Sequence, residues 1–263
     1  MTPDYHGHFA GKTVVLTGAC GVIGDWLARG FAEQGARLML SDRMPDKLRT
    51  LAERLPTETR THVTELTEDA SLRDLIATTT QAWGAPDIVV NNAGVYPSGW
   101  LLDIDLAEWD RIFDVNLRAV FALTQGFARA MVEHEKPGAI VNISSGAARK
   151  MRTTVVPYCV SKTALDRLTK GFALELARHG IRVNSVEPGF AAGSEASPVP
   201  PAHVQAVTAG IPLGRASEPG DALAAVLWLC SPAAAYVTGA TLAVDGGNSI
   251  GASVVFQDKK EPL

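Results

Sequence analysis

Short β-branched runs alternate with longer amphipathic stretches over the whole chain, and this alternation constrains the fold more than any other feature. The apolar runs are Thr13–Thr17, Arg37–Ser41, Thr61–Glu65, Asp87–Asn91, Ala139–Ser144, Ile181–Glu187 and Thr241–Asp245. The expected helices are Ile23–Gln34, Pro45–Leu55, Asp69–Trp83, Ala107–His134, Tyr158–His179 and Pro219–Cys230. Strands that are apolar on both faces need helices on each side of the sheet. We therefore predict an α/β fold with a doubly wound, seven-stranded parallel sheet.

The domain organisation is expected to be simple. The 263 residues contain no Pro/Ser-rich linker, internal repeat or compositional break, which indicates one domain over residues 1–263. Residues 190–217 are rich in Ala, Pro, Ser and Gly and follow an expected strand. An insertion at that edge of an open sheet is well placed to form a substrate lid, and the alternative is a disordered connection. The tail 251–263 is either frayed or in contact with a neighbouring subunit.

Charge and cysteine content exclude several classes of protein. A formal charge of −4 and an isoelectric point near 5.9 argue against nucleic acid as a partner, because phosphate binding needs a basic surface. Cys20, Cys159 and Cys230 are widely spaced, which favours reduced thiols over a disulfide framework or a metal site. The sequence shows neither a signal peptide nor a membrane-spanning apolar stretch. We expect a cytoplasmic protein with no bound metal and no membrane partner.

The junction between the first expected strand and helix is rich in glycine, with Gly18, Gly21 and Gly24 close together. Glycines let the chain turn sharply and bring backbone N–H groups against a pyrophosphate, where a helix N-terminus adds partial positive charge. The spacing GxxGxxG differs from the usual GxGxxG, so these residues also fit a plain strand–helix turn. The pattern predicts a dinucleotide site.

Asp42 ends the second expected strand and indicates which dinucleotide binds. A carboxylate there accepts hydrogen bonds from the adenosine ribose hydroxyls and repels a 2′-phosphate. We therefore predict NAD(H) over NADP(H). Arg43 opposes this assignment, because an arginine beside the carboxylate can pair with that phosphate. The alternative for Asp42 is an ordinary carboxylate in a turn.

Tyr158 and Lys162 lie four residues apart at the start of an expected helix, and therefore on one helical face. A free tyrosine has a pKa near 10 and is a weak base at neutral pH. A neighbouring ammonium and an oxidised nicotinamide would each favour the phenolate, and a pKa of about 7 requires about 4 kcal/mol of differential stabilisation. The pair predicts an acid–base couple, although YxxxK also occurs by chance on protein surfaces.

Further elements occur in order along nearly the whole chain. They are Thr17–Gly24 (TGACGVIG), Asp42, Asn91–Gly94, Asn116, Ser144–Ser145, Tyr158 with Lys162, Pro188–Gly189, Tyr236–Gly239 and Asp245–Gly247. In this combination the chain resembles the short-chain dehydrogenase/reductase family, whose members have a single Rossmann-like domain. The resemblance implies an oxidoreductase acting on a small-molecule alcohol or ketone. It also implies a homotetramer, with contacts through the two longest expected helices and the last strand.

The resemblance implies a catalytic tetrad. Tyr158 would be the general acid or base, and Lys162 would lower its pKa and hold the nicotinamide ribose. Ser145 would bind the substrate oxygen, and Asn116 would hold a water in a proton relay. The plain alternatives are a helix-stabilising amide for Asn116 and a strand-end hydroxyl for Ser144. The predicted cofactor contacts are Gly18, Gly21, Ile23, Asp42, Glu65, Leu66, Asn92, Gly94, Tyr158, Lys162 and Gly189, and the predicted substrate contacts are Ser145, Tyr96 and Glu187.

Three positions depart from the family pattern. Val22 stands where most short, single-domain members have glycine, while Gly21 gives the spacing of the extended branch, and we expect binding to survive with an altered loop. Gly193 replaces the threonine that commonly holds the nicotinamide carboxamide. Glu187 precedes Pro188, where a small or neutral residue is usual, and it either approaches the substrate or satisfies local backbone donors.

The substrate pocket is expected around Tyr96, Trp100 and Arg149–Arg152, whose three basic residues either steer an anionic substrate or form a solvated loop. The leading prediction is an NAD-dependent dehydrogenase of a secondary alcohol. A close alternative reduces 3-oxoacyl thioesters with NADPH, and Ile211–Arg215 resembles bacterial members of that kind. A non-catalytic dinucleotide sensor or scaffold is the alternative of another class. A sugar epimerase or dehydratase would lack room for its substrate domain.

Overall fold

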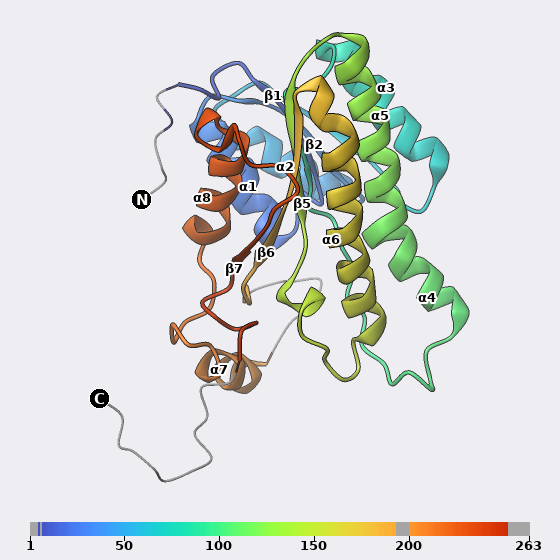
Figure 1. Ribbon diagram of the computed structural model, residues 1–263, viewed down its shortest axis with the longest axis vertical. Helices are drawn as coiled ribbons and strands as arrows, with labels where there is room; N and C mark the ends of the chain where they lie inside the picture. Colours follow the sequence, from blue (N-terminus) through green and yellow to red (C-terminus); the bar gives the residue numbers. More distant parts are fainter. Residues whose placement is uncertain (1–4, 6, 193–199, 252–263) are drawn as a thin grey trace.

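The computed structural model describes residues 5, 7–192 and 200–251, which form one sheet between two layers of helices (Figure 1). The seven strands of the described residues all pair in parallel, in the order β3-β2-β1-β4-β5-β6-β7. They are β1 Thr13–Thr17, β2 Arg37–Asp42, β3 Thr59–Val63, β4 Ile88–Asn91, β5 Gly138–Ile143, β6 Ile181–Pro188 and β7 Thr241–Val244. The predicted doubly wound, seven-stranded parallel sheet in a single Rossmann-like domain is confirmed.

Helices cover both faces of this sheet, as strands that are apolar on both sides require. They are α1 Val22–Glu33, α2 Pro45–Glu53, α3 Asp69–Trp83, α4 Leu106–Phe113, α5 Ala119–Glu133, α6 Val156–Leu176, α7 Pro201–Ala209 and α8 Pro219–Cys230. One buried apolar cluster joins α1, α2 and α8 to the sheet and includes Phe31 and Leu227. The cluster on the opposite face joins α3, α5 and α6 and includes Phe127 and Ala173. The two clusters hold the strands in place, so that their carboxyl ends form one edge.

The third strand begins two residues earlier than predicted and ends at Val63 rather than at Glu65. It is an edge strand that pairs only with β2, and most of its side chains are exposed, so its sequence carries no apolar alternation. Its register follows from the backbone, which pairs Asp42 with Val63. As a result Glu65 and Leu66 lie beyond the strand end, on the same edge as Asp42.

The stretch that we expected to form one helix from residue 107 to residue 134 is divided. After α4 comes a π-helical turn, Asp114–Arg118, and α5 follows it directly. Asn116 lies in this turn and is fully buried. Turns of this wider type occur often at functional sites, because the extra residue redirects a side chain.

The segment between β6 and α8 contains α7, a helix that the sequence patterns did not predict. None of the side chains of α7 is buried, and its apolar and polar residues do not separate into two faces. Residues 193–199, including Gly193, and the tail 252–263 lie outside the described residues. The lid over residues 190–217 therefore stays a prediction.

The order of the strands places one point of reversal between β1 and β4. The chain steps from β1 to β2 and β3 on one side, and from β4 to β7 on the other. In open α/β sheets ligands bind at the carboxyl ends of the strands at such a point. Most of the predicted site residues follow β1, β2, β4, β5 and β6 directly, and they therefore gather on this edge.

Candidate active site

The loop after β1 is shaped by glycines that leave no room for a side chain. Gly18 has a φ of +64°, and a Cβ there would lie 2.7 Å from the Cα atom of Ala93. A Cβ at Gly24 would lie 2.1 Å from the carbonyl oxygen of Gly18. Both distances are too short for a real contact, so the loop, the start of α1 and the turn after β4 pack backbone against backbone. This packing positions the first N–H groups of α1 at the sheet edge.

Gly21 and Val22 mark the departure from the usual glycine spacing, and the structure gives its consequence. Gly21 is the N-cap of α1 with φ −77° and ψ 167°, an extended conformation open to any residue, and it offers no side-chain cap to the helix. A Cβ at Gly21 would meet only the Gly18 carbonyl oxygen, at 3.4 Å. The helix begins at Val22 itself. Val22, in place of the usual glycine of the family pattern, is accommodated as the first residue of the helix. No side chain caps this helix N-terminus, so its N–H groups remain available to an anion.

Asp42 closes the loop from the side of β2. Its Oδ2 atom accepts a hydrogen bond from the backbone N–H of Cys20 at 2.9 Å, and Oδ1 accepts one from the N–H of Met44 at 3.2 Å. An ionised carboxylate has about four lone-pair positions, so both oxygens retain acceptor capacity. The backbone carbonyl of Asp42 also accepts the N–H of Thr64, which brings Glu65 beside it.

The turn after β4 is fixed to β1 by Asn92. The side-chain amide of Asn92 donates to the carbonyl oxygens of Thr17 and Gly18, both at 3.0 Å, and the Thr17 hydroxyl accepts the N–H of Asn92 at 3.1 Å. Gly94 then passes over the site. A Cβ at Gly94 would lie 3.4 Å from both Oδ1 of Asn116 and Nζ of Lys162. The absence of a side chain at Gly94 therefore lets the backbone pass close to these two groups.

Asn116 uses most of its hydrogen-bonding groups within the protein. Its Oδ1 accepts the N–H of Val95 at 2.8 Å, and its Nδ2 donates to the Val95 carbonyl at 2.9 Å and to the Ser161 hydroxyl at 3.0 Å. The Ser161 hydroxyl in turn donates to the carbonyl oxygen of Tyr158. Asn116 therefore connects the turn after β4 to the first turn of α6. Its role in holding a water stays a prediction.

Lys162 is buried beside Tyr158. Its Nζ donates to the carbonyl oxygen of Ile143, at the end of β5, at 2.8 Å, and lies 5.8 Å from the centre of the Tyr158 ring. Burial lowers the pKa of Lys162 to about 8, and the charge of Asp166 acts in the opposite direction. The ammonium is therefore poised close to neutral pH, where its charge can respond to neighbouring groups.

Ser145 and Tyr158 meet through their hydroxyl groups. The Ser145 hydroxyl donates to the Tyr158 oxygen, and Ser145 Oγ also accepts the N–H of Ala147 at 3.2 Å as it begins the 3₁₀ turn Gly146–Ala148. Burial raises the pKa of Tyr158, and the Ser145 hydrogen bond and the Arg152 charge only reduce this rise. In the chain without a cofactor, desolvation therefore outweighs the groups that favour the phenolate. The lowering of the phenol pKa by Lys162 together with an oxidised nicotinamide stays a prediction.

Tyr96 lies at the mouth of this site. Its ring centre is 5.9 Å from that of Tyr158, and 47 % of its surface is exposed. Trp100 and Met151 are also exposed, and the carbonyl oxygen of Thr154 accepts the N–H of Gly99 at 2.7 Å. This hydrogen bond joins the segment after β4 to the segment before α6. It brings the exposed Tyr96 and Trp100 segment close to the start of the helix that carries Tyr158.

Glu187 and Gly189 are placed differently. The Glu187 side chain is fully buried, and its Oε2 atom lies 2.7 Å from Nε of Arg149. Gly189 packs against β7, where its N–H donates to the carbonyl of Val244 and a Cβ would lie 3.0 Å from Asp245. The burial of Glu187 favours the structural reading of this residue over direct contact with a substrate. It also means that one of the three basic residues of 149–152 is already paired.

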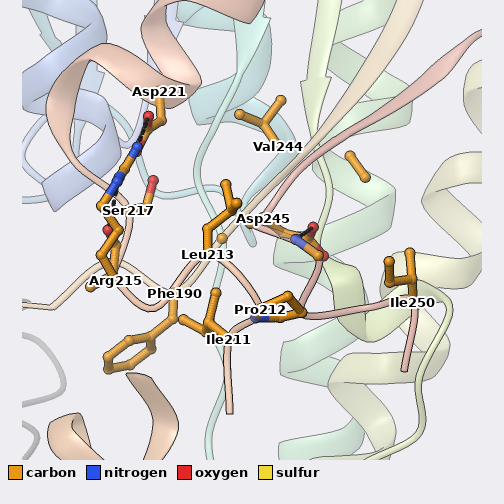
Figure 2. A pocket seen from close by; sticks show the side chains of 15 residues that line it. Phe190, Ile211, Pro212, Leu213, Arg215, Ser217, Asp221, Val244, Asp245 and Ile250 are labelled. Atoms are coloured by element: carbon orange, nitrogen blue, oxygen red, sulfur yellow. Dashed lines mark hydrogen bonds and ion pairs between the residues drawn. The ribbon is translucent and has the colours of Figure 1, made fainter. Parts of the chain in front are cut away.

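A cavity of about 510 Å³ adjoins Gly189 on the α8 side of the sheet (Figure 2). Its wall includes the ion pair of Arg215 and Asp221, with N–O distances of 2.6 and 2.8 Å. At its floor Gly246 and Gly247 have positive φ values, and Cβ atoms there would lie within 3.0 Å of Ile211 and Pro212, respectively. The segment Ile211–Arg215 therefore packs directly on the end of β7.

Three polar residues at the site escaped the sequence analysis. Thr17 fixes the turn after β4, Ser161 holds Asn116, and Asp166 lies one helical turn beyond Lys162. The spacing of Lys162 and Asp166 by four residues places them on one face of α6 and could have pointed to the third of these. No sequence signal distinguishes Thr17 or Ser161 from other small polar residues.

The chain carries the features of a short-chain dehydrogenase/reductase throughout. The family model described as Enoyl-(Acyl carrier protein) reductase matches residues 18–249. Galactitol 2-dehydrogenase (L-tagatose-forming) of Cereibacter sphaeroides is 36% identical over 253 residues, which cover 94% of this chain and 99% of the relative. The 3-oxoacyl-[acyl-carrier-protein] reductase of Thermotoga maritima is 33% identical over 240 residues, with 90% and 97% covered.

Solved structures agree with this assignment. A short-chain type dehydrogenase/reductase of Mycobacterium marinum superposes with a TM-score of 0.87 at 35% identity, covering 93% of this chain and 98% of that chain. The 3-ketoacyl-(acyl-carrier-protein) reductase of Brucella melitensis, complexed with NADH, gives 0.84 at 29% identity, with 92% and 99% covered. Actinorhodin polyketide ketoreductase, in a variant solved with NADPH, gives 0.83 at 29% identity, with 91% and 97% covered.

The fold and the site define the class of a nicotinamide-dependent oxidoreductase. The chain belongs to the short-chain dehydrogenase/reductase family, within which its relatives include polyol dehydrogenases and 3-oxoacyl reductases. Among the described helices, none has the length and apolar character needed to cross a membrane. The described residues also contain no cluster of His, Cys, Asp or Glu side chains suited to a metal ion.

Proposed function

We propose that this chain transfers a hydride between NAD(H) and a secondary alcohol or ketone, with Tyr158 as the general acid or base. The observation that carries the proposal is the hydrogen bond between the hydroxyls of Ser145 and Tyr158, with the Lys162 amine beside the phenol ring. A pure binding protein would need no such constellation on the cofactor edge of the sheet. This argues against the sensor or scaffold alternative.

The residues of the edge fit a dinucleotide. The open N-terminus of α1 and the close packing at Gly18 would receive the pyrophosphate. Asp42 would accept the ribose hydroxyls, with Ile23, Glu65 and Leu66 around the adenosine end. Lys162, whose Nζ lies beside Gly94 and Asn116, would hold the nicotinamide ribose. When bound, NAD supplies the hydride acceptor or donor for the reaction.

The protein's own side chains would handle the proton. In the oxidising direction the Ser145 hydroxyl donates to the substrate oxygen and orients it, and Tyr158 accepts the proton of the alcohol. Lys162 holds positive charge near the phenolate, which stabilises it. The burial that raises the pKa of Tyr158 also excludes water from the charged pair, so each added positive charge acts more strongly. Asn116 would position a water through which the proton leaves.

Asp42 favours NAD(H), because a 2′-phosphate would face a carboxylate that the Cys20 and Met44 N–H groups fix in place. Arg43 is exposed beside it and supports the competing assignment, an NADPH-dependent 3-oxoacyl thioester reductase similar to the Thermotoga relative. Comparing kcat/KM with NADH and NADPH separates the two. A clear preference for NADPH would refute the assignment to NAD(H).

The exposed surface near Tyr158 bears on the substrate. Tyr96, Trp100 and Met151 present aromatic and apolar surface there, and Arg152 is near enough for its charge to act on the phenol. We propose a small secondary alcohol, of the polyol or hydroxyacyl type that the relatives' names describe, with Arg152 available to a negative group. The galactitol and sorbitol dehydrogenase relatives make polyols the first substrates to test.

A homotetramer in the cytoplasm completes the proposal. Helix α4, the π-helical turn, α5 and α6 enclose a groove of about 560 Å³, lined largely by Phe113, Leu117, Phe121, Ala164 and Leu168. Phe121 is 43 % exposed although it is a large apolar side chain. A second copy of the chain packed on these helices would cover this surface.

A substrate screen that follows NADH absorbance tests the function directly. Polyols, hydroxy acids and hydroxyacyl thioesters are offered with NAD⁺ at alkaline pH, and the ketones with NADH at neutral pH. We expect turnover on at least one class that is lost in Tyr158→Phe. Cofactor binding without turnover over the whole panel would favour the sensor instead.

A further inference from the structure

Two carboxyl groups, those of Asp166 and Glu187, come together between the catalytic helix α6 and strand β6. Ser185 and Glu187 are two residues apart on β6, and their side chains therefore point to the same face of the sheet. The Ser185 hydroxyl donates to Oδ1 of Asp166 on α6 at 2.9 Å, so Asp166 lies over that face. The next residue of β6 on that face is Glu187. Its side chain is fully buried and is close enough to the Asp166 carboxyl for a hydrogen bond.

The charged groups around Asp166 and Glu187 do not neutralise the negative charge of the two carboxylates. Arg149, which follows the 3₁₀ turn begun by Ser145, reaches Oε2 of Glu187 at 2.7 Å. The approach is not aligned as a hydrogen bond, and neither Glu187 oxygen has a hydrogen-bond partner of good geometry among the described residues. Asp245, at the end of β7, adds a third carboxylate near Arg149 and satisfies the N–H groups of Gly247 and Ser249.

Two carboxylates in contact cannot both stay ionised at little cost in a desolvated site, and one proton is then shared between them. Burial raises the pKa of Glu187 to about 7, Arg149 opposes this rise, and the Asp166 carboxyl adds to it. The pair therefore holds a proton at mildly acidic pH and loses it near neutrality.

Asp166 connects this proton to the catalytic amine. It lies four residues after Lys162, on the same face of α6, and its charge raises the pKa of Lys162 against the effect of burial. When the shared proton leaves, the negative charge facing Lys162 increases. The ammonium form is then favoured, and with it the phenolate of Tyr158.

We propose that Asp166 and Glu187 share one proton, and that its release fixes the charge of Lys162 and so prepares Tyr158 to accept a proton. Both are positioning residues, because they act through Lys162 and not on the substrate. The catalytic consequence rests on the proposed function, whereas the shared proton does not.

Infrared spectroscopy observes the shared proton without any activity. The carbonyl stretch of a protonated carboxylic acid is followed from pH 5 to pH 9 in the wild type, Glu187→Gln and Asp166→Asn, with Asp46→Asn as a matched exposed control. We expect the wild type and the control to lose one such band near pH 7 and Glu187→Gln to show no loss in this range. In Asp166→Asn the loss should move to lower pH, because the repulsion is removed. The proposal would be overturned if Glu187→Gln lost the same band near pH 7 as the wild type does, or if the wild type showed no such band.

Unfolding measurements supply an independent check of the same proton. The pKa of Glu187 is higher in the folded chain than in the unfolded chain, so the folded state binds an additional proton between about pH 4.5 and pH 7. Its contribution to stability is complete below this range and is lost as the pH rises through about 7. Glu187→Gln should lose this decline in urea unfolding, and Asp46→Asn should keep it. If Glu187→Gln fails to fold, the lower transition of Asp166→Asn decides the question.

Kinetics then tests the link to catalysis. The pH profile of kcat/KM for alcohol oxidation should contain a rising limb that Glu187→Gln shifts along the pH axis and Glu187→Asp partly restores. An unchanged profile together with a confirmed infrared band would overturn the link while leaving the shared proton in place. Absence of the band from the wild type would contradict the shared proton, whereas full activity of Tyr158→Phe would contradict the proposed function.

Discussion

On the β1–β3 side of the sheet the site is built from backbone, and on the β4–β7 side it is built from buried side chains that carry protons. The first half relies on Gly18 and Gly24, whose missing side chains let peptide groups approach one another, and on Asp42, which two N–H groups fix. The second half relies on Tyr158 and Lys162, whose pKa values are shifted by burial. The comparison teaches that the cofactor half depends on shape, whereas the catalytic half depends on charge.

Removing one charge from the catalytic half should have the largest effect. Lys162→Met keeps the length of the side chain but removes the ammonium, and we expect kcat to fall by about 10³-fold, within the range for acid–base catalysis. Lys170→Met is the matched control, since Lys170 lies on the same helix, is exposed and donates to the carbonyl of Gly239. It should stay within about twofold of the wild type by the small worth of surface charges. An equal loss of kcat in both variants would show that disturbance of helix α6, and not removal of the Lys162 charge, causes the effect.

Alanine substitutions at two glycines test whether the cofactor half depends on the shape of its backbone. Gly18→Ala forces a Cβ against Ala93 at a positive φ, and the strain should cost about 1–3 kcal/mol, seen as a lower Tm and weaker NADH binding. Gly21→Ala introduces the same methyl group where φ is −77° and the nearest contact is 3.4 Å. It should bind NADH almost as the wild type does. If the two variants behaved alike, the shape argument would be wrong.

Cofactor choice should respond more modestly. Asp42→Asn removes the negative charge but keeps the shape and the acceptor oxygen, so we expect the ratio of kcat/KM for NADH over NADPH to fall by about tenfold, or about 1.4 kcal/mol. Asp42→Asn combined with Arg43→Gln should lose the activity with NADPH that the single variant gains, because no positive charge remains beside the 2′-phosphate. An unchanged ratio in the single variant would place the discrimination elsewhere.

The smallest effect is expected at the exposed mouth. Arg152→Gln should raise KM for a substrate with a negative group by about threefold to fivefold, because an exposed charge is screened by solvent and salt. A neutral alcohol is the internal control, and its KM should not change. Equal effects on both substrates would mean that Arg152 shapes the loop rather than steering the substrate.

Periodicity was sufficient to predict the sheet and most of the helices. Apolar runs such as Thr13–Thr17 are buried along their whole length and leave no choice of face, so their limits are clear. The polar edge strand β3 was misplaced by two residues, because nothing in TRTHV reports on pairing with β2. Helix α7 was missed because it has no buried side chain and hence no apolar stripe.

The positions of the tetrad at the sheet edge follow from strand order, which a sequence pattern can indicate. The electrostatics of the tetrad could not be predicted in the same way. The pKa values of Tyr158 and Lys162 depend first on how deeply each side chain is buried. That of Lys162 also depends on the carboxylate of Asp166, one helical turn away. Likewise the π-helical turn that aims Asn116 depends on tertiary contacts with Val95 and Ser161. These quantities are properties of the packed interior.

The central claim is that Tyr158 accepts a proton once positive charge is brought beside it. Its ionisation can be measured by ultraviolet difference titration between the wild type and Tyr158→Phe, with and without saturating NAD⁺. We predict that the phenol alone titrates above its ordinary pKa, as burial requires, and that NAD⁺ lowers this pKa. A phenol that titrates at the same pH with and without NAD⁺ would contradict the account.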